Sequence, residues 1–173
     1  MIWINCATAV TAACLSLGCG CAASSERRPE QRAAEVADHH EAWGATFSLP
    51  AGWSGGENDA GGIELTDGEL ALMVGRSALA EGESLDAFAK GRRTTLEELG
   101  AAESLEQSEQ RFGGERALLY RGRGSDGVEL RLLVTRLDPR TGLSFLLIGE
   151  AKQAARADAA WTKLLGSLTL PGK

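Results

Sequence analysis

The run "LSFLLIGEA", residues 143–151, constrains the fold of this 173-residue chain more than any other segment. From Leu143 to Ile148, apolar side chains occupy both alternating sets of positions, so a strand of these residues would be apolar on both faces. Such a strand belongs at the centre of a sheet, because both of its faces must be covered. We therefore expect a sheet with another layer packed on each side.

The preceding segment, "GGERALLYRGRGSDGVELRLLVTRLD", predicts a long β-hairpin. Residues 125–127 would form a three-residue loop, with Gly127 in the left-handed conformation. The predicted cross-strand pairs are Tyr120 with Leu132, Leu118 with Val134, Arg123 with Glu129 and Arg121 with Arg131. One face of this hairpin is apolar, which specifies the register, and the other is polar near the loop.

Two segments have the apolar spacing of helices. In "SLDAFAKGRRTTLEELG", Ser84 is a suitable N-cap and Gly100 a suitable terminator. Its predicted buried stripe consists of Leu85, Phe88, Ala89, Leu96 and Leu99. Arg92 and Arg93 fall on or beside that stripe, where long cationic side chains usually extend along its edge toward water. The closing segment, residues 154–170, has a stripe of Trp161, Leu164, Leu165 and Leu168.

Shorter strands are predicted in the remaining segments. Ala45, Phe47 and Leu49 alternate with polar residues, and Pro50 ends this strand. Residues 55–62, "GGENDAGG", predict a flexible loop, and Asp67-Gly68 predicts the turn of a hairpin. Residues 103–112 are polar on both faces, which indicates an edge strand or a helix extension. Antiparallel strands with two helices place the chain in the α+β class.

All four cysteines lie within the first 21 residues, and no charged side chain occurs between Met1 and Ser25. This segment is too short and too polar for a convincing membrane span, and it is typical of a secretory signal. Cys19 and Cys21 have C-x-C spacing, which is a poor start for a tetrahedral zinc site. The C-x-x-C spacing of a redox pair is missing from the sequence.

The segment "LSLGCG" resembles the lipobox of bacterial lipoproteins, with small Gly18 directly before Cys19. It departs from that pattern at Ser16, where leucine is usual, and in having no basic residue at its start. The resemblance implies a signal peptide over residues 1–18 and a lipid anchor to the membrane at Cys19. Gly20 follows Cys19 where an aspartate would favour inner-membrane retention, so the outer membrane is favoured.

Other interpretations of the leader remain. Cleavage by ordinary signal peptidase near Ala22-Ala23 would give a periplasmic or secreted protein, and an uncleaved leader is a further alternative. Residues 19–42 are predicted to be a flexible linker, in which His39-His40 would be an exposed pair. The folded domain is then expected over residues 43–173.

Four short features of this domain, "FSLPAGW", "SLDAFA", the hairpin over "SDG" and "LLGSLTL", together resemble the PsbP-like/DcrB-like superfamily. The resemblance covers about residues 43–170. It implies an antiparallel sheet of six to seven strands flanked by helices, an α/β/α sandwich. Members include an extrinsic subunit of the plant oxygen-evolving complex, bacterial envelope lipoproteins and chaperones for type VI secretion effectors. They are accessory or binding modules, so the resemblance implies a non-catalytic function.

The residues themselves also favour binding over catalysis. The sequence contains no G-x-S-x-G or P-loop motif, and both histidines fall in the predicted linker, so no catalytic residues, metal site or cofactor are predicted. The formal net charge of −6 disfavours nucleic-acid binding.

Two binding functions are considered. In the first, a stripe of Arg121, Arg123 and Arg131 contacts an unidentified envelope protein, unless the stripe is only a solvated face balanced by Glu129. In the alternative, a chaperone or small-molecule carrier holds an apolar ligand against the sheet. That function would require an apolar groove flanked by Phe88 or Trp161.

Overall fold

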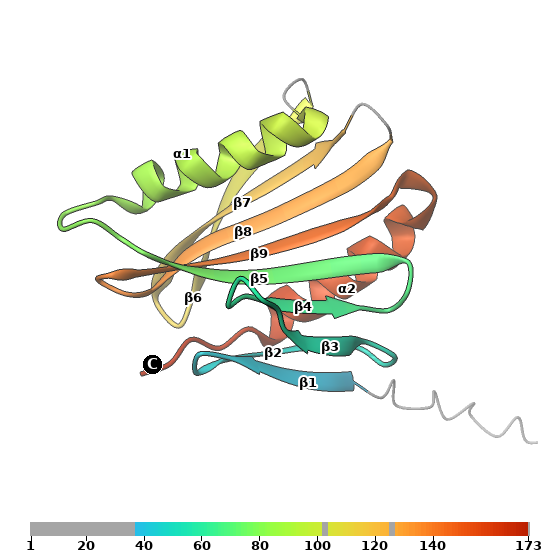
Figure 1. Ribbon diagram of the computed structural model, residues 1–173, viewed down its shortest axis with the longest axis horizontal. Helices are drawn as coiled ribbons and strands as arrows, with labels where there is room; N and C mark the ends of the chain where they lie inside the picture. The colour runs from blue at the N-terminus through green and yellow to red at the C-terminus, as the bar shows by residue number, and fades with distance from the viewer. Residues whose placement is uncertain (1–36, 102–103, 125–126, 173) are drawn as a thin grey trace, which may run out of the picture. The chain divides into compact units, whose positions relative to one another are not determined.

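Seven antiparallel strands form the main sheet in the spatial order β3-β4-β5-β9-β8-β7-β6 (Figure 1). The computed structural model describes residues 37–101, 104–124 and 127–172, so the predicted signal peptide and Cys19 lie outside the described residues. The main-sheet strands are β3 (Ser54–Glu57), β4 (Ile63–Thr66), β5 (Leu70–Ala78), β6 (Glu106–Phe112), β7 (Glu115–Arg123), β8 (Val128–Asp138) and β9 (Thr141–Glu150). A separate two-stranded sheet contains β1 (Ala37–Ala42) and β2 (Ala45–Pro50).

The strand predicted to be central is β9, which lies between β5 and β8. Leu143, Phe145 and Leu147 are buried on one face, and Leu146 and Ile148 pack on the other. The hairpin of β7 and β8 has the predicted register, including Tyr120 opposite Leu132 and Arg121 opposite Arg131. The two-sided apolar run and the hairpin pattern were therefore sufficient to position the middle of the sheet.

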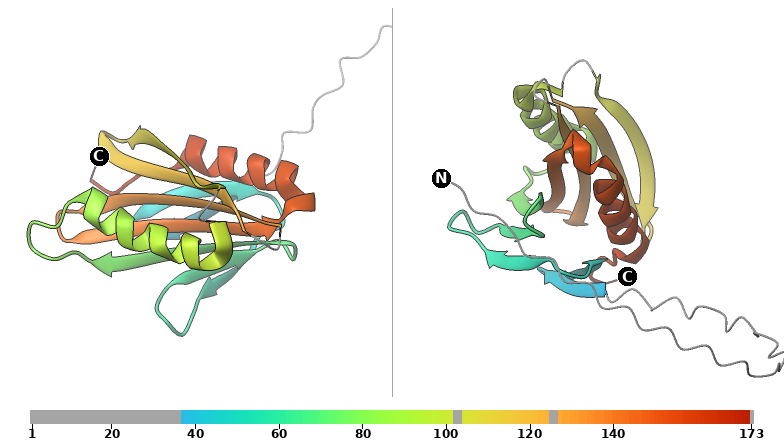
Figure 2. Two further views of the ribbon diagram at one scale, coloured as in Figure 1. Left: turned by 90° about the horizontal axis from the view of Figure 1, so that it is seen from above. Right: turned by 90° about the vertical axis from the view of Figure 1, so that its right-hand side faces the viewer.

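Two helices cover opposite faces of the sheet (Figure 2, left). Helix α1 (Leu85–Leu96) packs on β7 and β8, whereas α2 (Ala154–Ser167) packs on β8, β9 and the β1–β2 hairpin. The predicted α+β class and the α/β/α layering are confirmed. With 12 and 14 residues, neither helix provides the long apolar segment that a membrane-spanning helix requires, and the described part of the chain contains no such helix.

The start of α1 is as predicted, because Ser84 Oγ accepts a hydrogen bond from the Ala87 N–H at 3.1 Å. Its predicted stripe is wrong at Leu99, which is 45% exposed. After Leu96 the backbone widens into a π-helical turn over Glu97–Ala101, which rotates Leu99 away from the core. Gly100 has a φ of 85°, the left-handed conformation expected of a helix terminator.

The segment 97–101 lies close to Gly122 and Gly124 of the β7 region. A Cβ atom added at Gly124 would lie 2.7 Å from the Leu99 carbonyl oxygen, and one at Gly122 would lie 2.9 Å from the Ala101 Cβ. These glycines therefore permit the close packing of α1's end on the sheet. Residues 104–112 include the edge strand β6, one of the two structures predicted for that polar segment.

Two predicted flexible segments are ordered. Residues 37–42 form β1 and pair with β2, so the domain begins before the predicted boundary at residue 43. Residues 54–57 form β3, and Asn58 Oδ1 closes the following turn by accepting the Gly62 N–H at 2.9 Å. Backbone pairing provides much of the order, and side-chain hydrogen bonds of Asp38 in the first segment and Asn58 after the second add to it, although these segments contain few apolar residues.

The two histidines lie in strand β1 and not in a linker; His39 is exposed as predicted, whereas His40 is half-buried. His39 Nδ1 lies 2.8 Å from Ser48 Oγ, and the His40 ring stacks on Phe47 with 5.5 Å between centroids. His40 Nε2 is buried without a hydrogen-bond partner. Burial is the main influence on His40 and lowers its pKa below the ordinary value of 6.5, although Asp38 opposes this shift and His39 adds to it.

Because the pKa of His40 is lower in the folded state, the unfolded chain binds this proton more readily, and stability should be lost as pH falls below about 6.5. We predict that the urea midpoint of the wild-type chain decreases between pH 7.5 and pH 5.5. His40→Gln should show a smaller decrease, since glutamine does not titrate. An equal decrease in both proteins would show that burial of His40 does not contribute to the pH dependence.

Candidate functional site

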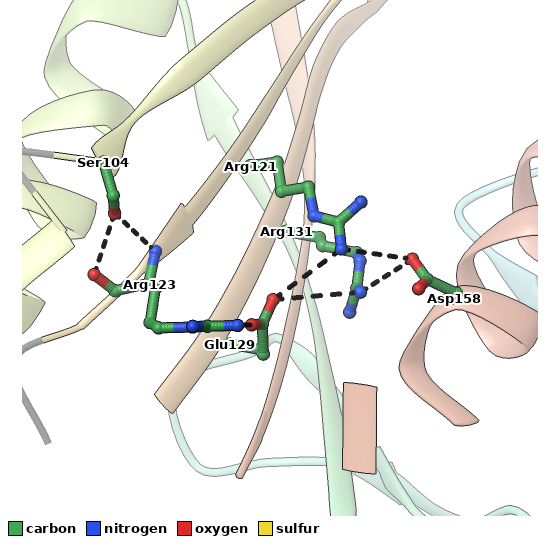
Figure 3. Close-up of polar contacts among 6 residues, drawn as sticks. All are labelled: Ser104, Arg121, Arg123, Glu129, Arg131 and Asp158. Atoms are coloured by element: carbon green, nitrogen blue, oxygen red, sulfur yellow. Dashed lines mark hydrogen bonds and ion pairs between the residues drawn. The ribbon is translucent and has the colours of Figure 1, made fainter. Parts of the chain in front are cut away.

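The three arginines predicted to bind a partner lie on the face of the sheet that α2 covers (Figure 3). Arg121 and Arg123 come from β7 and Arg131 from β8. The observed register brings them together with Glu129, as the hairpin pattern predicted. Asp158, which sequence reasoning did not identify, is added from α2.

Arg131 cannot contribute to a surface stripe, because the residue is only 1% exposed. Its Nη2 atom lies 2.8 Å from Asp158 Oδ1 and 4.0 Å from Glu129 Oε2. The position is buried because α2 passes over this part of β8. The prediction of three equivalent exposed arginines was therefore wrong at Arg131, whose two carboxylate partners compensate its charge inside the fold.

The other two arginines are exposed but are also paired. Arg123 donates to Glu129 Oε1 from Nε at 2.9 Å and from Nη2 at 2.6 Å. Arg121 Nη2 lies 3.6 Å from Asp158 Oδ1 and 4.0 Å from the buried Glu129. Two carboxylates thus face three guanidinium groups, which leaves one positive charge. We call these five residues, Arg121, Arg123, Glu129, Arg131 and Asp158, the charged cluster. The cluster joins β7, β8 and α2 as a structural ion-pair network.

A second candidate site is a groove on the opposite face, beside α1. It has a volume of about 320 Å³ and lies between α1, β5, β9 and the loop that joins β3 to β4. The residues that line it are Asn58, Ala60, Gly61, Gly62, Ile63, Met73, Val74, Gly75, Arg76, Arg92, Thr95, Leu96, Leu132, Ser144 and Leu146. We call this site the α1 groove.

The α1 groove exists because α1 covers the β7–β8 half of the sheet and packs little on the β4–β5 half. On the α1 side of β5, the groove is lined by Met73, which has a flexible side chain, and by Gly75, which has none. Met73 is 39% exposed and is one of two large apolar residues classed as exposed within the described ranges. An exposed methionine in a concave site is typical of adaptable binding surfaces.

Polar groups occur along one part of the α1 groove. Arg92 donates a hydrogen bond to Ser77 Oγ, and its guanidinium carbon lies 5.3 Å from the centre of the Phe88 ring. Arg76 also borders the site, but its side chain alternates with Met73 and Gly75 on β5, and its guanidinium carbon lies 5.1 Å from the centre of the Trp43 ring, which packs on the α2-face core. The groove therefore combines apolar side chains with the cation of Arg92, a combination suited to binding and orienting a ligand.

The α1 groove is not the groove that the sequence predicted. The Phe88 ring packs so closely on Gly142 that an added Cβ would lie 2.3 Å from it, and Phe88 is not a lining residue. Trp161 lines a smaller cavity of about 270 Å³ on the other face, beside Arg131 and Asp158. The sequence feature that could have indicated the α1 groove is the segment "LALMVG", residues 70–75. On one side of the strand formed by this segment, the small residues Ala71 and Gly75 flank Met73.

The fold is shared with solved structures of low sequence identity. Cyanobacterial PsbP (CyanoP) from Synechocystis sp. PCC 6803 is 15% identical, with a TM-score of 0.57 over 79% of this chain and 93% of CyanoP. LpqN, described as involved in cell envelope biogenesis of Mycobacterium tuberculosis, is 14% identical, with a TM-score of 0.58 over 78% of this chain and 88% of LpqN. No family model and no curated protein matched the sequence. The similarity shows a PsbP-like fold.

The buried and exposed arginines of the charged cluster should contribute unequally to the free energy of unfolding. Arg131→Met should lower the free energy of unfolding by about 3 kcal/mol, because it removes a buried, paired charge and leaves Glu129 with fewer partners. Arg121→Gln should cost less than about 1 kcal/mol, since the Arg121 side chain is 52% exposed and its ion pairs are screened by water. Urea denaturation compares the two variants. Equal costs would contradict the structural role assigned to Arg131.

Proposed function

We propose that this chain is a non-catalytic accessory protein of the bacterial cell envelope, anchored to the membrane through Cys19, whose domain binds a small ligand in the α1 groove. The observation that carries the binding function is the groove itself, with exposed Met73 among its lining residues. Its volume is at the lower end of the range of small-molecule sites, about 300–1,000 Å³. The apolar lining with exposed Met73 supports the carrier function over the partner-binding arginine stripe.

The envelope location is supported by two independent features. The charge-free leader and the "LSLGCG" segment support export and lipidation at Cys19. The described domain has a fold similar to that of LpqN, a protein involved in cell envelope biogenesis of Mycobacterium tuberculosis. Gly20 after Cys19 favours the outer membrane over the inner membrane, and without lipidation the protein would be periplasmic or secreted.

A protein partner is the second candidate, because Arg121 and Arg123 keep 52% and 60% of their side chains exposed despite their ion pairs. These two residues could contact acidic groups of an unidentified envelope protein. The positive charge left in the cluster gives such contacts a preferred sign. Arg131 takes no part in this surface, since it is buried.

Blocking the α1 groove tests the proposed binding function. Thr95 is exposed on α1 and lines the groove, so Thr95→Trp should fill the entrance without disturbing the core. Thr94→Trp is the matched control, because Thr94 is exposed on the same helix turn and is not a lining residue. We predict that native mass spectrometry of protein purified from its own membrane detects a bound small molecule in the wild type and in Thr94→Trp, but not in Thr95→Trp.

Native mass spectrometry of these variants decides on the groove function, and a second measurement decides on the partner-binding function. A ligand retained equally by Thr94→Trp and Thr95→Trp, or no ligand in any of the proteins, would contradict the groove function. Crosslinking in the native membrane examines the other candidate. Loss of a specific crosslinked protein in Arg121→Glu/Arg123→Glu, together with an unoccupied groove, would favour the partner-binding function.

The anchor is tested by the mature N-terminus. We predict that mass spectrometry finds Cys19 at the N-terminus with a thioether-linked diacylglycerol, and that Cys19→Ser moves the protein out of the membrane fraction. The lipid provides the only predicted attachment, so its removal should release the domain. A free amino group at Ala23 or Ser24 in the wild-type protein would contradict lipidation and indicate a secreted or periplasmic protein.

A further inference from the structure

We propose that the α1 groove binds an anionic amphiphile, a carboxylate or phosphate carried on an alkyl chain, with the acidic group at Arg92 and the chain over β5 and β9. This inference rests on the proposed function, because it takes the groove to be a ligand site. It goes further by naming the chemical class of the ligand. The evidence comes from the apolar lining, from the state of Arg92 and from its contrast with the charged cluster.

The apolar part of the groove matches an alkyl chain. Met73 and Leu146 come from the neighbouring strands β5 and β9, and α1 and β8 contribute Leu96 and Leu132. A chain placed there would cover the exposed surface of Met73, which a purely polar ligand would leave in contact with water. Met73 has an unbranched side chain that can adjust to chains of different shape.

Arg92 is suited to the acidic end of the ligand. Its Nη2 atom donates to Ser77 Oγ, and the guanidinium lies over the Phe88 ring. These contacts orient the planar guanidinium group. The hydrogen bond to Ser77 uses only Nη2, so most of the five N–H donors of Arg92 remain for a ligand. Guanidinium donors match the geometry of carboxylate and phosphate oxygens.

The ion-pair pattern distinguishes Arg92 from the arginines of the charged cluster. Among the described residues, the arginines that form ion pairs are Arg93, Arg116, Arg121, Arg123, Arg131 and Arg156. Arg92 forms no ion pair among the described residues, and neither do Arg76, Arg111, Arg136 and Arg140; of these five, Arg92 alone extends from α1 at the groove. The chain has 24 acidic and 18 basic residues, so acidic partners are not scarce. The charge of Arg92 is therefore available to an anionic ligand.

Calorimetric titration of the full chain carrying Cys19→Ser tests the ligand class. The probes are decanoate, decyl phosphate, decyltrimethylammonium, acetate and inorganic phosphate, each below its micelle concentration where it forms micelles. We expect decanoate and decyl phosphate to bind at least about tenfold more tightly than the cationic probe and than either short anion. Equal binding of the cation would overturn the role of charge, and equal binding of the short anions would overturn the role of the chain.

Variants of two adjacent arginines locate the acidic end. Arg92→Gln should weaken decanoate binding at least about tenfold, because it removes a charge-assisted hydrogen bond. It should leave decyltrimethylammonium binding unchanged, and Arg92→Lys should retain part of the preference for anions. Arg93→Gln is the matched control, since Arg93 is exposed and already paired with Glu97 at 2.7 Å. Equal effects of the two glutamine variants would overturn the assignment of Arg92.

The outcomes also separate this inference from the proposed function. If the anionic and cationic decyl probes bind equally and Thr95→Trp blocks both, the groove remains a ligand site and only the anionic class is wrong. If no probe binds, the inference fails, and native mass spectrometry of the Thr95→Trp pair independently decides whether the groove holds another ligand. Thermal melting of each variant confirms that it is folded before titration.

Discussion

The burial of β9 on both faces determines how the other layers of the fold are arranged. Its apolar side chains project alternately toward α1 and α2, so each face needs its own covering layer. On one face, α2 and the β1–β2 hairpin provide this layer, and ion pairs from Arg131 and Arg121 to Asp158 join α2 to the sheet. On the other face, α1 alone provides the cover, and it packs mainly on β7 and β8.

The candidate ligand site follows from this unequal cover. The α2 face is covered by a helix and a hairpin apart from the smaller cavity beside Trp161, and Glu129 and Asp158 compensate two of the three charges in its arginine cluster. The α1 face remains open beside β5, where Met73 is exposed and Arg92 has no acidic partner among the described residues. Apolar surface and uncompensated charge therefore occur together in the groove, as an amphiphilic ligand would require.

Much of the fold could be predicted because its signals are local. The two-sided apolar run identified β9, and the hairpin register followed from one alternating pattern. The site could not be predicted in the same way. The burial of Arg131 depends on where α2 crosses β8, and the groove depends on which strands α1 leaves uncovered. Both are tertiary properties, and neither β1 nor β3 has a strong apolar pattern of its own.

We claim that the α1 groove is the ligand site, and methyl NMR of Met73 can show whether a ligand occupies it. The chain has two methionines, Met1 and Met73, so methyl labelling of methionine places one reporter on the floor of the groove and one in the leader. Decanoate should shift the Met73 signal in the wild-type chain and have little effect on it in Thr95→Trp. A Met73 signal that does not move while decanoate binds, or that moves equally in Thr95→Trp, would contradict the claim.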